Sequence, residues 1–178
     1  IVSYLHDEEA SIRIGTHVVD ADDEPWLFCG MPEPPYGVMF RHTASGWQTI
    51  DLEQACPGLT FAAPGRATAT SRDASGHVHL LVSTAHKGGG EGWYHPDNEL
   101  HHIAFDPKGR VSRQLTSSDP AAARWLPSIE LWDWTAADAS CDQGHWYAWT
   151  SGLSAGWMDA ADYEDTLKTD VWLGRLRP

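Results

Sequence analysis

The side chains best suited to chemistry are concentrated between positions 86 and 98. His86, Tyr94 and His95 form a candidate acid–base set, because imidazole and phenol groups both accept and donate protons. Trp93 and Asn98 lie in the same stretch. An indole face can stack on a sugar ring, and a carboxamide hydrogen-bonds to hydroxyl groups. This combination predicts a site for a ring-shaped, hydroxylated ligand, and the alternative is a polar loop with a packed tyrosine.

Arginine and tryptophan residues elsewhere would complete such a site. Arg66 and Arg124 are candidates for binding a carboxylate, because a guanidinium group donates two parallel hydrogen bonds to it, and Arg41 is a further candidate. Trp125 and Trp157 are candidates for stacking on the ligand. The alternative role for these tryptophans is packing between sheets.

Two histidine pairs raise the question of a zinc site. His77 and His79 alternate on one face of a predicted strand, whereas the neighbours His101 and His102 point to opposite faces. One of these residues could join His95 around zinc. We favour histidines that are hydrogen-bonded between blades, and we assign no metal ligand.

The chain is acidic, with a formal net charge of −13 and a pI near 5.0 over 178 residues. This charge argues against nucleic acid or an anionic membrane as the main partner, since both attract positively charged surfaces. The acidic run 159–165 is a candidate calcium site, but it lacks the spacing and the glycine of an EF-hand, so a solvated loop is the simpler interpretation. We therefore predict no required cofactor.

The three cysteines, Cys29, Cys56 and Cys141, show neither a CxxC motif nor zinc-ligand spacing. Because their number is odd, they cannot form a complete set of intramolecular disulfides. A Cys29–Cys56 disulfide is one possibility, and buried thiols are the interpretation that we favour.

Internal repeats define the elements that must position the candidate site. Three stretches each read as a strand, a turn and a second strand: 16–30, 67–84 and 128–152. The first two are followed by predicted hairpins at 37–52 and 99–116, whereas the third is followed by 170–178 and stops one strand short. Each unit is thus predicted to be an antiparallel meander of about 50 residues with four short strands.

Four-stranded units at this period are typical of the blades of a β-propeller. We expect blades at about 11–52, 66–116 and 127–178 in an all-β chain, and the alternative is a β-sandwich. Closed propellers have about four to eight blades. We therefore expect a portion of a larger ring that a second chain or a further segment completes.

Two hairpin tips carry a resemblance to a known family. The tips 42–47 (HTASGW) and 105–111 (FDPKGRV) are similar to the Asp-box, a Ser-x-Asp-x-Gly-x-x-Trp turn. The first has Ala44 at the aspartate position, and the second lacks the tryptophan. The chain thus resembles the BNR or sialidase-like propellers, a group that includes glycosidases and polysaccharide lyases.

The long loops are predicted to share one face of such a fold. In a propeller, the connection between the second and third strand of a blade lies on the same face as the connections between blades. Here these are the long segments, at 30–36, 84–99, 150–170, 53–66 and 118–127. We therefore expect the site on this loop-rich face, because function concentrates in loops that a rigid scaffold holds.

The resemblance implies an enzyme of carbohydrate metabolism, secreted or periplasmic, that cleaves a uronate-containing polysaccharide by β-elimination. His86 or His95 would act with Tyr94 as base and acid, and Arg66 would neutralise the uronate carboxylate. Trp93, Asn98, Arg124, Trp125 and Trp157 would bind the substrate.

Two other functions are compatible with the sequence. A sialidase-like glycoside hydrolase would need a carboxylate pair, for which Glu91, Asp97 and Glu130 are available. A non-catalytic propeller for carbohydrate binding or assembly would need the tryptophans and no histidine.

Overall fold

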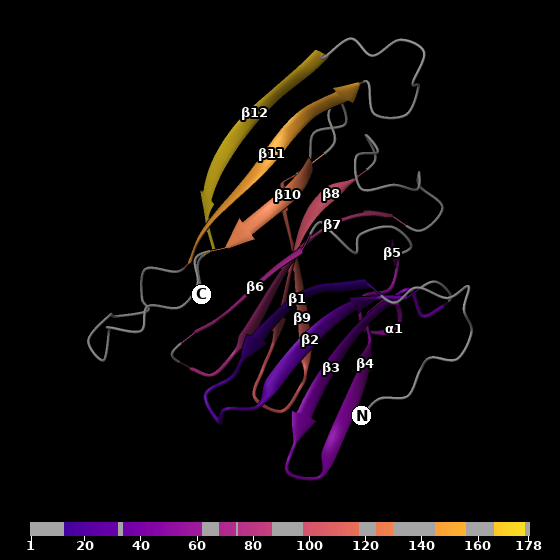
Figure 1. Cartoon of the computed structure of the whole chain (residues 1–178), viewed down its shortest axis with the longest axis vertical. Coiled ribbons are helices and arrows are strands. Elements are labelled where there is room, and N and C mark those ends of the chain that lie inside the picture. The colour runs from indigo at the N-terminus through magenta and orange to yellow at the C-terminus, as the bar shows by residue number, and fades with distance from the viewer. Residues whose placement is uncertain are drawn as a thin grey trace.

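The computed structural model describes residues 13–31, 34–61, 68–73, 75–86, 98–117, 124–129, 145–155 and 166–176. Over these residues the chain consists of strands and one four-residue helix, and the strands form three antiparallel sheets (Figure 1). The prediction of an all-β chain of small antiparallel sheets is confirmed. Within the described ranges, no helix has the length and apolar character needed to cross a membrane.

The strands follow one another in chain order within each sheet, as in a meander. Sheet 1 contains β1 (Arg13–Val19), β2 (Pro25–Gly30), β3 (Gly37–Thr43) and β4 (Gly46–Asp51), and α1 (Leu52–Ala55) follows it. Sheet 2 contains β6 (Thr68–Arg72), β7 (Val78–His86), β8 (Glu99–Phe105) and β9 (Val111–Ser117), and the short β5 (Leu59–Thr60) also pairs with β7. Sheet 3 contains β10 (Arg124–Ile129), β11 (Trp146–Ala155) and β12 (Thr166–Arg175).

One type of aspartate turn closes three of the hairpins. Asp20, Asp73 and Asp106 each accept, through Oδ1, hydrogen bonds of 2.8–3.0 Å from the backbone amides two and four residues later. The third residue after each aspartate has a positive φ, +60° at Asp23 and +79° at both Gly76 and Gly109. Asp and Gly favour such turns because they combine local hydrogen bonding with left-handed backbone. The turn predicted within 67–84 and the hairpin tip predicted at 105–111 are thereby confirmed.

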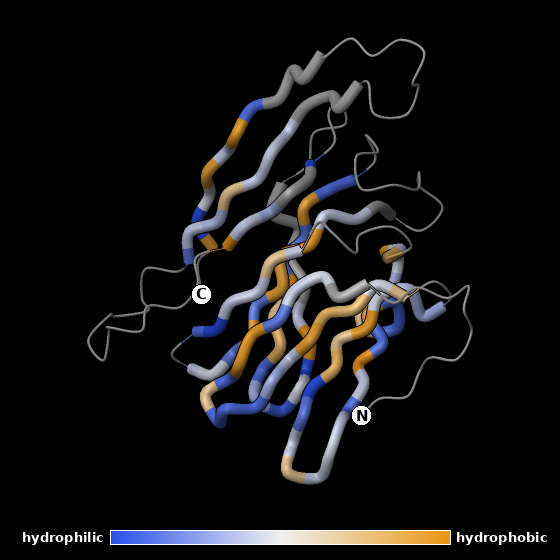
Figure 2. Tube along the Cα trace, in the orientation of Figure 1, coloured by the Kyte–Doolittle hydropathy of each residue, from blue (hydrophilic) through white to orange (hydrophobic). Residues whose placement is uncertain are grey.

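Sheet 2 is covered on both faces, because it lies between sheets 1 and 3 (Figure 1). Along β7, Val78, Leu80 and Val82 pack in the core shared with sheet 1, whereas Leu81 packs in the core shared with sheet 3. All four side chains are 0% exposed. Figure 2 shows hydrophobic residues in all three sheets. Because side chains alternate between the two faces of a strand, β7 contributes residues to both cores.

The first strands of the three sheets are neighbours. β1 lies beside β6, and β10 lies beside β6 and β7. Thr70 joins the first two sheets, because its hydroxyl is 2.9 Å from that of Thr16 and donates to the carbonyl of His17 at 2.8 Å. A Cβ atom at Gly15 would lie 2.6 Å from the hydroxyl of Thr68, so glycine permits this close approach of the strands.

The outer face of sheet 1, away from sheet 2, is also apolar. Cys29, Val38 and Phe40 form a small buried cluster there, against which Leu27 packs. Burial raises the pKa of the Cys29 thiol. Cys56 lies instead in the core between sheets 1 and 2. The disulfide alternative for these two cysteines is therefore wrong, and both are buried thiols; Cys141 lies outside the described residues.

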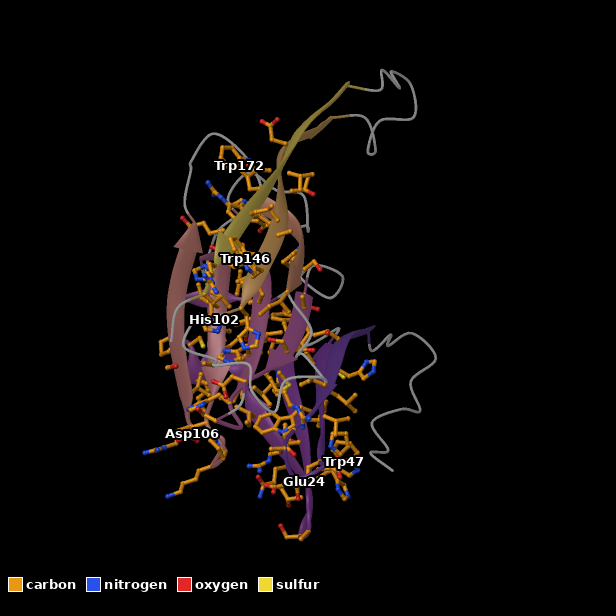
Figure 3. The ribbon with its side chains drawn as sticks, turned by 90° about the vertical axis from the view of Figure 1, so that its left-hand side faces the viewer. Glu24, Trp47, His102, Asp106, Trp146 and Trp172 are labelled. Carbon is orange, nitrogen blue, oxygen red and sulfur yellow. The ribbon has the colours of Figure 1, made fainter. Side chains whose placement is uncertain are left out.

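The outer face of sheet 3 is apolar and exposed. Tyr147 and Trp149 point toward sheet 2, so the alternate residues on β11 and their partners on β12 point away from it. Three of these outward side chains are Trp146, Val171 and Leu173, with 50%, 76% and 71% of their surface exposed. Figure 3 shows Trp146 and Trp172 on this sheet. Large apolar side chains are therefore exposed to solvent on this face.

Candidate functional site

The structure describes some of the predicted site residues, and the others lie outside the described ranges. Four of them lie in the described part, where His86 ends β7, Asn98 precedes β8, and Arg124 and Trp125 begin β10. The others, Arg66, Trp93, Tyr94, His95 and Trp157, lie outside the described residues. The segment that carries Trp93, Tyr94 and His95 joins β7 to β8.

Arg124 and Asn98 meet at the junction of sheets 2 and 3. The backbone amide of Arg124 donates to the carbonyl of Asn98 at 3.4 Å. The hydroxyl of Ser83, on β7, donates to the carbonyl of Arg124. Sheet 2 therefore holds both backbone groups of Arg124, and this fixes the point at which its side chain leaves the chain. Two residues that the sequence predicted for one site are thus brought together.

This junction is polar and buried. Arg124 is 3% exposed and Asn98 is 4% exposed, and Ser83 is fully buried. Thr84, next along β7, donates its hydroxyl to the carbonyl of Thr60 on β5. A guanidinium group stays charged at any physiological pH, so its burial is costly unless polar or anionic groups surround it. The junction therefore holds a buried guanidinium group next to polar backbone and side-chain groups.

Arg41, the further candidate, lies elsewhere. It is on β3, directly opposite Trp26 on β2, and its guanidinium lies 4.9 Å from the centre of the Trp26 ring. Its Nη2 atom is 3.3 Å from a carboxylate oxygen of Glu24 and 3.8 Å from one of Asp20. Arg41 thus supports the turn between β1 and β2, at the end of sheet 1 opposite the long loops.

His101 and His102 point to opposite faces of β8, as predicted. His101 is 2% exposed, and its Nε2 atom lies 3.7 Å from a carboxylate oxygen of Glu99. His102 points toward sheet 3 with Leu100, which packs in that core. The alternation of side chains along a strand was sufficient to separate the two histidines.

A second cluster of chemically active groups lies between sheets 2 and 3, close to His102 (Figure 3). The Nδ1 atom of His79 and the Nε2 atom of His102 are 2.9 Å apart. The Nε2 atom of His79 is 3.3 Å from Oδ2 of Asp73, which also lies 3.3 Å from Nδ1 of His77. From sheet 3, the ring of His145 approaches to 5.1 Å from that of His79, measured between ring centres.

The cluster shifts the acid–base equilibria of its members. Burial, together with the charges of His79 and His145, lowers the pKa of His102 from 6.5 to about 4. For Asp73, burial acts to raise the pKa, but hydrogen bonds from His79 and the His77 amide outweigh it and lower the pKa to about 2. At neutral pH the cluster therefore contains a carboxylate and at least one neutral imidazole.

Sequence reasoning did not assemble this cluster. It placed His77 and His79 on one face, and it favoured histidines hydrogen-bonded between blades, whereas the hydrogen bond between His79 and His102 joins two strands of one sheet. It did not include Asp73 or His145, because both belong to turns or strand ends whose partners depend on how the sheets stack. The signal was a turn aspartate followed four and six residues later by histidines.

Among the residues that the structure describes, no three His, Cys, Asp or Glu side chains are arranged to hold a metal ion. His95 and the acidic run 159–165 lie outside these residues, as do Glu91, Asp97 and Glu130. Comparisons of the chain with protein-family models, with curated proteins and with solved structures find no match.

Proposed function

We propose that the three sheets are consecutive blades of a β-propeller rather than parts of a two-layer sandwich. In a sandwich each sheet has one face toward solvent, whereas sheet 2 is buried on both faces. The outer faces of sheets 1 and 3 are apolar as well. The neighbouring positions of β1, β6 and β10 also fit a ring in which first strands surround a central axis.

In this proposal, further blades cover the two outer faces. A second chain or a further segment would place a sheet against Trp146, Val171 and Leu173, where large apolar side chains are exposed. It would also lie along β12, which ends the strand order of sheet 3.

For the function, we propose binding of an acidic, uronate-containing polysaccharide at the loop-rich end and its cleavage by β-elimination. The observation that carries the proposal is the buried junction at which Asn98 and Ser83 fix Arg124. A guanidinium group in such a site neutralises the uronate carboxylate and so makes the neighbouring C5 proton more acidic. Arg66, which was predicted for this role, lies outside the described residues, and Arg124 is the alternative neutralising residue in this proposal.

The chemistry then needs one base and one acid. His86 or His95 removes the C5 proton, the electron pair forms the C4–C5 double bond, and the C4–O bond breaks. Tyr94 gives its proton to the leaving oxygen, and no oxidant or metal is required. Residues 87–97, which contain Tyr94 and His95, join the strands that end and begin at this junction.

The test is a panel of uronate polysaccharides, followed by ultraviolet absorbance of the unsaturated product and by binding measurements. We expect Tyr94→Phe to lower turnover at least 100-fold while binding changes less than about threefold, a loss typical of a missing general acid. Arg124→Lys should weaken both binding and turnover, because lysine cannot make the bidentate contact.

The matched control is Arg110→Lys, because Arg110 is 79% exposed at the opposite end of sheet 2 and pairs with Asp106. If new reducing ends form without ultraviolet absorbance, the activity is that of a glycoside hydrolase and not of a lyase. Binding without cleavage, unaffected by Tyr94→Phe, would indicate a non-catalytic binding propeller. A folded protein that binds no uronate polymer would refute the proposal.

A further inference from the structure

The histidine cluster at the boundary of sheets 2 and 3 is built around one hydrogen bond between two imidazole rings. Nδ1 of His79 and Nε2 of His102 are 2.9 Å apart, so one of these nitrogens donates and the other accepts, and Nε2 of His79 lies 3.3 Å from the Asp73 carboxylate. One ring of the pair can be protonated and donate, because the other ring then accepts through its facing nitrogen. A second proton would place two donors opposite each other across 2.9 Å.

The second proton also places charge across the interface between the sheets. His79 and His102 belong to sheet 2, and His145 directly precedes β11 of sheet 3, with its ring 5.1 Å from that of His79. The carbonyl of His145 accepts a hydrogen bond of 2.8 Å from the amide of Leu176, at the end of β12. Repulsion at His145 would therefore act on both strands of this pair, at the end where β11 begins and β12 ends.

We propose that this cluster is an acid-sensitive contact that holds sheet 3 against sheet 2 at neutral pH and weakens their packing when the cluster takes up a second proton. The proposal stands on the geometry of the interface and does not depend on the proposed catalytic function. It requires only protons, and the group whose charge changes is His102, in its hydrogen bond with His79.

The boundary between sheets 1 and 2 provides an internal comparison. Asp20 occupies the same turn position as Asp73, and six residues after each aspartate a strand residue meets its Oδ2 atom. In sheet 1 this residue is Trp26, whose Nε1 donates to Asp20 at 2.8 Å and whose ring lies 5.5 Å from that of Phe105 in sheet 2. In sheet 2 it is His79. One interface thus has an indole, which does not titrate, where the other has an imidazole.

Among the described residues, the carboxylate that contacts the cluster is that of Asp73. In the described residues, the ionisable groups that face His79 and His102 are Asp73, His77 and His145. Of the nearest further charges, the guanidinium of Arg72 donates to the carbonyl of Asp20, at the boundary with sheet 1. The carboxylate of Asp106 pairs with Arg110. Asp73 thus meets two of these imidazoles, His77 and His79.

The direction of the pH effect follows from His102. Its pKa is about 4 in the fold and 6.5 in an exposed histidine, so between these values the opened state takes up a proton that the packed state does not. The packing is complete above pH 6.5 and weakens as the pH falls toward 4. From this residue alone, the ratio of opened to packed molecules should rise about 25-fold between pH 7.5 and pH 5.0.

Hydrogen exchange measured by mass spectrometry, corrected for the intrinsic pH dependence of exchange, tests the proposal on the intact chain. We expect the opening of β11 to rise about 25-fold between pH 7.5 and pH 5.0, whereas amides of β2 change less than about threefold. In His102→Gln the rise in β11 should fall below about threefold, because the amide still donates to His79 but does not titrate. The control is His17→Gln, at an exposed position on sheet 1, which should behave as the unaltered chain.

A rise in β11 opening that His102→Gln leaves unchanged would overturn the proposal. If this variant does not fold, imidazole resonances of the unaltered chain decide the question by nuclear magnetic resonance. A histidine that titrates below pH 5 supports the acid-sensitive contact, and its absence overturns it. Zinc that protects β11 at pH 7.5, with the protection reversed by a chelator, would assign the cluster to a metal ion instead and would also overturn the proposal.

Discussion

Replacing Leu80 and Leu81 one at a time tests the three-layer arrangement on which both proposed sites depend. These residues are adjacent on β7, both are 0% exposed, and they point into different cores. Leu80 packs toward sheet 1 with Val78 and Val82, and Leu81 packs toward sheet 3 with Leu100. In a sheet with one solvent face, only one of two adjacent residues would be buried in this way.

Both leucine substitutions should strongly lower the free energy of unfolding. Truncation of a fully buried leucine to alanine removes its transfer free energy and leaves a cavity, and together these destabilise a protein by about 2–5 kcal/mol. We therefore expect Leu80→Ala and Leu81→Ala each to lower the free energy of unfolding by about 3 kcal/mol. The matched control is Leu173→Ala on β12, where the side chain is 71% exposed. Its effect should stay below about 0.5 kcal/mol.

Urea denaturation, followed by tryptophan fluorescence and extrapolated linearly, provides the measurement. A Leu81→Ala effect below about 1 kcal/mol, beside a Leu80→Ala effect near 3 kcal/mol, would refute the reasoning. It would mean that sheet 3 does not cover sheet 2 in solution, and the Arg124 junction would lose its structural basis.

Two further predictions concern close contacts within the sheets. Gly174→Ala should destabilise the chain by about 1–3 kcal/mol in thermal unfolding, because the new Cβ would lie 2.4 Å from Cζ of the Tyr147 ring; an unchanged melting temperature would contradict this packing. Asp20→Ala should cost about 1–3 kcal/mol in urea denaturation, because it leaves the indole nitrogen of buried Trp26 without its acceptor. Asp22→Ala, in the same turn but exposed, is the control, and equal effects of the two substitutions would contradict the assignment.

Local chemistry made the hairpins predictable. An aspartate followed three residues later by glycine gave the turns at Asp73 and Asp106, because both the carboxylate and the left-handed glycine act within the turn itself. The hairpin at Gly46, with φ of +108°, was predictable for the same reason. Alternation along a strand likewise separated His101 from His102. None of these features needs information from another sheet.

Whether Cys29 and Cys56 can form a disulfide depends on contacts between residues that are far apart in the sequence. Cys29 and Cys56 are 27 residues apart in the sequence (56 − 29), and spacing alone left a disulfide possible. The structure places Cys29 on the outer face of sheet 1 and Cys56 in the core on its other face. Two thiols on opposite sides of a sheet cannot reach the short distance that a disulfide requires.

By itself, the sequence determined the all-β character, the chain-order meanders and the turn residues, because propensity, side-chain alternation and turn chemistry act over a few neighbouring residues. Only the tertiary structure decided that sheet 2 is buried on both faces, that Arg124 is fixed between Asn98 and Ser83, and that His145 joins His79 and His102. These contacts join residues that are far apart in the chain. Which of them meet is set by how the apolar faces of the sheets pack, and no local pattern specifies that order.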